Sequence, residues 1–66
     1  MSWIDDSKAR LIAARDNLTV GISIIDEALE EIPEGTPEHD DAMSKRAMLV
    51  VLLAGANAAL RLWGVT

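Results

Sequence analysis

The 66-residue chain contains no cysteine, phenylalanine or tyrosine, and its only aromatic residues are two tryptophans. Without cysteine, it can form neither a disulfide nor a cysteine-ligated zinc site. Basic residues are also scarce, since six lysines and arginines stand against eleven acids and give a formal net charge of −5. This balance argues against a general nucleic-acid-binding protein, whose surface requires an excess of lysine and arginine.

Aliphatic residues and alanine supply nearly all of the 50% hydrophobic content. That composition favours helices over sheets. A chain this short forms one domain, so we assign residues 1–66 to a single helical-hairpin domain. The acidic sequence Met-Ser-Trp-Ile-Asp-Asp at the start has no signal-peptide core. We therefore expect a cytoplasmic protein, with membrane association or a place in a viral particle as alternatives.

Residues 33–37, Pro-Glu-Gly-Thr-Pro, predict a turn between two helices. Pro33 ends the first helix, Gly35 allows the chain to turn, and Thr36 caps a second helix with Pro37 at its first position. We place the helices at about 3–32 and 37–63, because Ser2 and Gly64 have the residue types of a cap and a stop. A connection this short makes the helices antiparallel, so the predicted fold is an all-α, two-helix hairpin.

The first helix carries a seven-residue repeat that predicts a coiled-coil seam. Residues 19–25 are β-branched and include a glycine, which is typical of a strand, but the repeat continues through them. We expect one continuous helix, with Gly21 as the position of any bend. Large apolar residues recur at Ile4, Leu11, Leu18, Ile25 and Ile32, and small residues follow three positions later at Ser7, Ala14, Gly21 and Ala28.

The second helix is apolar on every side between residues 47 and 60, except at Asn57. A single neighbouring helix covers roughly a third of such a surface. We therefore predict self-association into a four-helix or larger bundle, in which Asn57 either sets the register or is an ordinary boundary amide. The predicted self-association residues are Leu49, Leu52, Leu53, Ala54, Ala58, Leu60, Gly21, Ala14 and Ala28.

Charge is distributed unevenly along the predicted hairpin. Residues 26–41 hold eight acids and no lysine or arginine, whereas the rest of the chain holds three acids and all six bases. An antiparallel dimer of hairpins, with turns at opposite ends, avoids crowding the acids. Trp3 and Trp63 are expected together at the open end, where they close the bundle, anchor a partner protein or meet a membrane interface.

Few residues could carry catalysis or bind a metal. His39 is the one histidine, and no serine, threonine or lysine has the neighbours that a nucleophile requires. The acids around the turn match neither an EF-hand loop nor a bundle di-iron site. We predict no enzyme activity, no cofactor, and neither catalytic nor metal-binding residues.

The sequence thus predicts a non-enzymatic, homo-oligomeric structural, assembly or adaptor module that acts through protein–protein contacts. Its small size is typical of phage and plasmid accessory proteins. Three alternatives stay open. The chain could be a regulator or inhibitor that docks helix 37–63 or the tryptophan pair on a partner protein. It could instead be a membrane-associated protein with that helix in lipid, or a nucleic-acid-binding hairpin dimer that uses Lys8, Arg15 and Arg61.

Overall fold

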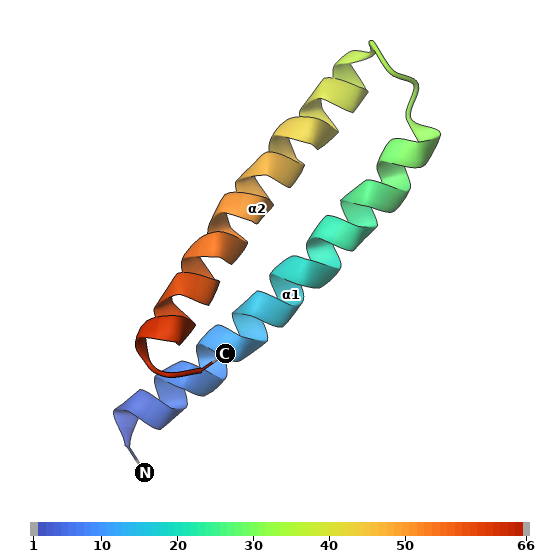
Figure 1. The fold of residues 1–66 in the computed structure, drawn as a ribbon. Coiled ribbons are helices and arrows are strands. Elements are labelled where there is room, and N and C mark those ends of the chain that lie inside the picture. Colours follow the sequence, from blue (N-terminus) through green and yellow to red (C-terminus); the bar gives the residue numbers. More distant parts are fainter. Residues whose placement is uncertain (1, 66) are drawn as a thin grey trace.

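Two antiparallel helices form the whole of the architecture in the computed structural model, which describes residues 2–65. Helix α1 spans Trp3–Glu31 and helix α2 spans Pro37–Leu62. They lie side by side along a rod with extents of 49 × 16 × 15 Å (Figure 1). The predicted all-helical hairpin is confirmed. Each helix ends one residue before its predicted end, because Ile32 and Trp63 are C-caps.

The predicted caps at the start of each helix are present. The Ser2 hydroxyl accepts a hydrogen bond from the Ile4 amide at 3.1 Å, and the Thr36 hydroxyl accepts one from the His39 amide at 3.2 Å. Thr36 also donates to the Pro33 carbonyl at 2.7 Å, which closes the turn. Gly35 has a φ of +82°, a left-handed conformation that glycine adopts without steric cost.

The end of α2 folds back on itself. Gly64 has a φ of +78°, and its amide donates to the Arg61 carbonyl at 3.0 Å. The Val65 amide donates to the Leu60 carbonyl at 2.8 Å, so the pair of bonds forms a Schellman motif. Helix α1 continues past this point, and Figure 1 shows its first turn extending beyond the end of α2.

The seam between the two helices follows alternating steps of three and four residues. On α1 the predicted large apolar positions lie in the seam, but the positions four residues after them complete it, and the predicted small residues Ala14 and Ala28 are exposed. Gly21 marks a close approach, because a β-carbon built there would lie 3.3 Å from the Leu49 Cδ1 atom. Helix α1 is continuous through this glycine. The seam positions, all covered or half-covered, are 4, 8, 11, 15, 18, 22, 25 and 29 on α1 and 39, 42, 46, 49, 53, 56 and 60 on α2, followed by the C-cap residue 63.

The core of a single hairpin is small. Within residues 2–65, only Ala56 and Leu60 are classed as buried, and Leu60 is 1% exposed. Both lie in the half of the rod farther from the turn. Pairing the two helices therefore leaves most of the apolar content of the chain uncovered.

Candidate functional site

Large apolar side chains remain exposed on the hairpin to an unusual extent for a monomeric soluble protein. Three of the nine lie on α1 and six on α2, so the second helix accounts for most of this surface. An exposed surface of this kind marks a site of contact with another protein or with lipid. The nine side chains are Trp3, Val20, Ile24, Met43, Met48, Val50, Val51, Leu52 and Leu62.

An open apolar groove of about 680 Å³ runs between the helices on one side of the rod. The groove is wide because small residues line it on both helices. Ala14 has only a methyl group, and no atom lies within 4 Å of a β-carbon built on Gly55. Asn17 is its one polar lining residue. The full lining consists of Leu11, Ala14, Asn17 and Leu18 from α1 and Leu49, Val51, Leu52, Gly55 and Ala56 from α2.

The side chains beside this groove form a second stripe on each helix, next to the seam. Residues three, four and seven apart lie on one side of a helix, so the stripe extends in both directions from the groove. A helix with two adjacent apolar stripes can contact two neighbouring helices, as helices of a four-helix bundle do. We call this surface the groove face; it comprises Arg10, Ala14, Asn17, Gly21, Ile24 and Ala28 on α1 and Met48, Val51, Leu52, Gly55, Ala59 and Leu62 on α2.

The structure divides the predicted self-association residues among several environments. Ala14 and Leu52 line the groove, and Ala28, Ala54 and Ala58 are exposed. Gly21, Leu49 and Leu53 are half-buried on the seam side, and Gly21 lies against Leu49 of its own chain. Leu60 is covered within a single hairpin, which leaves it no surface for a second copy.

Eight groove-face residues are not among the predicted self-association residues: Arg10, Asn17, Ile24, Met48, Val51, Gly55, Ala59 and Leu62. Their spacing from Leu52 and Ala14 was the available signal. Steps of three and four residues connect Met48, Leu52 and Gly55 on α2, and the same spacing connects Ala14 to Asn17 on α1.

The two tryptophans share one end of the rod but not one environment. Trp3 is 72% exposed in the first turn of α1, whereas Trp63 is half-buried at the C-cap of α2. Helix α1 extends beyond α2 at this end (Figure 1), and Trp3 remains exposed there. Trp3 lies seven residues before Arg10, and so on the same side of α1 as the groove face.

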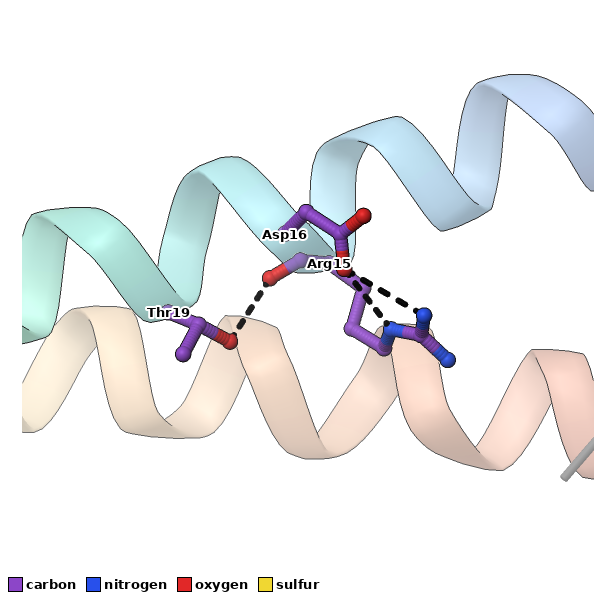
Figure 2. A network of polar contacts seen from close by, with 3 residues as sticks. All are labelled: Arg15, Asp16 and Thr19. Carbon is purple, nitrogen blue, oxygen red and sulfur yellow. Dashed lines mark hydrogen bonds and ion pairs between the residues drawn. The ribbon is translucent and has the colours of Figure 1, made fainter.

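The other side of the rod, near the same end, carries a smaller hollow lined by Arg15, Asn57, Leu60, Arg61 and Val65. Figure 2 shows the Arg15 guanidinium pointing toward the Asp16 carboxylate, with an Nη2–Oδ1 distance of 3.2 Å. The Thr19 hydroxyl donates to the Arg15 carbonyl at 2.9 Å (Figure 2). Asn57 thus lies beside two arginines, away from the groove face.

The ion pair that joins the two helices lies toward the turn. Arg46 of α2 donates to the Asp26 carboxylate of α1, and this hydrogen bond and charge raise the pKa of the guanidinium above its usual value. Lys45 pairs with Asp41 one helical turn earlier at 2.7 Å. In the part of the chain that the structure describes, no three histidine or acidic side chains are grouped as metal ligands would be.

Helix α2 also meets the length and composition requirements of a membrane span, with a mean hydropathy of 1.3 over 18 residues. Helices at the core of soluble bundles pass the same test. Comparison with known protein families, curated proteins and solved structures finds no match to this chain. Its function is therefore argued from the geometry of the groove face.

Proposed function

We propose that this chain is a non-enzymatic structural or assembly protein that self-associates through its groove face. Two hairpins joined in this way form a four-helix bundle. The observation that carries the proposal is the second apolar stripe beside the seam, where Leu52 stays 52% exposed next to an open groove. A second hairpin would place its own two apolar stripes against that groove, so that the stripes of both copies would be covered.

The size of the groove face supports this assembly. A rod 49 Å long and 16 Å wide presents a side whose area is on the order of 800 Å², which is about what each partner buries in a stable interface. Small residues at Ala14, Gly21 and Gly55 let a second pair of helices approach closely. The interface would then resemble the interior of a bundle, with leucine and methionine filling the space that the small residues leave.

The distribution of charge supports an antiparallel arrangement of the two copies. Residues 26–41 carry eight acids without a lysine or arginine, and they occupy the turn end of the rod. Turns placed together would bring sixteen carboxylates into one region, by doubling that count. Turns at opposite ends place each acidic segment near the open half of the second copy, which holds Lys8, Arg10, Arg15 and Arg61.

A lipid-bound form is the second candidate, and one observation favours it. Only 6% of the apolar 18-residue window in α2 is buried inside the hairpin. A bilayer would cover this helix on every side, including Met43 and Val50, which lie outside the groove face. Docking on an unrelated protein would cover part of the same surface.

The first test is the mass of the protein in detergent-free buffer, measured by light scattering after size exclusion. We expect a discrete dimer or a multiple of it. Leu52→Asp should raise the dissociation constant about 100-fold or more, because it places an unpaired charge in the interface. Val50→Asp is the matched control, since Val50 is also exposed, at 41%, and lies on the same helix but outside the groove face.

The outcomes separate the candidates. A dimer that Leu52→Asp dissociates and Val50→Asp leaves intact supports the groove face as the interface. A stable, soluble monomer contradicts self-association and favours docking on another protein. Protein that stays in solution only with detergent contradicts the soluble assembly and favours the lipid-bound form.

A further inference from the structure

We infer that the open end of each hairpin holds the turn of the second copy, with Trp3 and Arg10 as the residues that make the contact and fix the antiparallel orientation. This inference rests on the proposed function, because it assumes that two groove faces meet. It adds a specific pair of contacts that the groove itself does not contain.

The position of the groove along the rod is the first argument. Asn17 lines the groove and lies fourteen residues after Trp3, which corresponds to about 21 Å along a helix. The α1 lining runs from Leu11 to Leu18, so the groove lies in the open half of the 49 Å rod and its inner end reaches the midpoint. A two-fold axis through that inner end exchanges the ends of the rod, and it brings Trp3 of one copy to the level of residues 33–37 of the other.

The chemistry of Trp3 fits the turn that it would meet. Its side chain is 72% exposed in the part of α1 that extends beyond α2, so its own hairpin leaves it free to contact another chain. The turn offers the exposed residues Pro33 and Pro37 and the carboxylate of Glu34. An indole ring can pack against proline rings while its N–H donates to a carboxylate.

Arg10 adds the charge that complements the acidic segment. It is exposed on the groove side of α1, four residues before Ala14, and takes part in none of the ion pairs formed between described residues. It lies about 10 Å further into the rod than Trp3. The same two-fold axis brings it near the last two turns of α1 in the second copy, where Glu27 and Glu31 are exposed.

A pair of charge reversals tests the contact. Arg10→Glu should raise the dissociation constant of the dimer about 10-fold at low salt and by less at high salt, because it removes two attractions and creates two repulsions per dimer. Arg61→Glu changes the net charge equally but lies beside the hollow on the other side of the rod, so a change below about 2-fold is expected there. Trp3→Ala should weaken the dimer by a similar factor to Arg10→Glu, with little dependence on salt.

Equal effects of Arg10→Glu and Arg61→Glu would overturn the inference, since only net charge would then matter. Circular dichroism of each variant at a concentration where it is dimeric shows that the helices are intact. Loss of the contact without loss of helix content is the expected result.

Cross-linking gives an independent test of orientation, because the chain has no cysteine of its own. Asp6 is exposed one helical turn before Arg10, and Glu34 is exposed in the turn. A short bismaleimide should join an Asp6→Cys copy to a Glu34→Cys copy in a mixed sample, and it should leave Glu34→Cys alone unlinked. Links between two Glu34→Cys copies would overturn the antiparallel contact while the groove-face dimer stands, whereas a monomeric mass would overturn the dimer itself.

Discussion

The two halves of the rod are held together in different ways. In the turn half, the chain itself joins the helices, and the described contacts are polar: the Thr36 cap and the ion pair between Arg46 and Asp26. In the open half, no covalent link joins them, and this half contains both buried residues, Ala56 and Leu60. Apolar burial is therefore concentrated in the open half, where the backbone does not hold the helices together.

The same division explains the distribution of charge. Eight acids fit in the turn half because their side chains are solvated and the covalent turn prevents separation. The open half has three acids and depends on close packing around Leu60, over which the chain end folds through the Val65 amide. The predictions below test this division, beginning with the largest effect.

Leu60→Ala should lower the free energy of unfolding by about 2–4 kcal/mol, because it leaves a cavity at the most buried position of the open half. Met43→Ala is the control outside the groove face, where the side chain is 47% exposed and a change within about 0.5 kcal/mol is expected. Urea unfolding followed by circular dichroism, compared at equal protein concentration, measures both. Similar losses for the two variants would show that the open half has no distinct core.

Gly21 lies where the two halves meet, and substitutions there test how closely the helices approach. Gly21→Leu should destabilise the hairpin by about 1–3 kcal/mol, since its side chain would overlap Leu49. Gly21→Ala should be neutral or stabilising by up to about 1 kcal/mol, because alanine favours helix and the Leu49 methyl group can shift. A tolerated leucine would place the helices farther apart at this level than the 3.3 Å contact indicates.

Thr36→Ala should have a smaller effect than Leu60→Ala, about 1 kcal/mol, because it removes the cap of α2 and the bond to Pro33 while the covalent turn remains. Ser2→Ala removes the equivalent cap from the projecting first turn of α1 and should cost less than Thr36→Ala. Hydrogen exchange should show the loss confined to the first turn of each helix. A cost for Thr36→Ala as large as that of Leu60→Ala would contradict the division between the halves.

The sequence predicted the helices well because their limits depend on local residues. Ser2, Thr36, Pro37 and Gly64 act within one helical turn of their own positions, so each can be recognised without knowing the fold. The seven-residue repeat likewise predicted the large apolar positions of the seam on α1 and the continuity of the helix through the strand-like residues around Gly21, but it placed Ala14 and Ala28 in the seam, where they do not lie.

The division of α2 between seam and groove face could not be predicted in the same way. Leu52, Leu53, Leu60 and Leu62 have the same side chain, and an apolar surface on all sides gives no periodic signal to rank them. Which leucine is covered depends on how α2 is rotated against α1. The 1% exposure of Leu60 and the 87% exposure of Leu62 are consequences of that rotation.

Because the rod has a constant width, its length could change without changing the contacts between its helices. Both stripes repeat every seven residues, so a heptad inserted into each helix would extend the particle by about 10.5 Å and keep every contact in phase. An insertion of five residues would rotate one stripe away from its partner. In an assembly of antiparallel hairpins, helix length would therefore serve as a molecular ruler, fixing the distance between whatever is attached at the two ends.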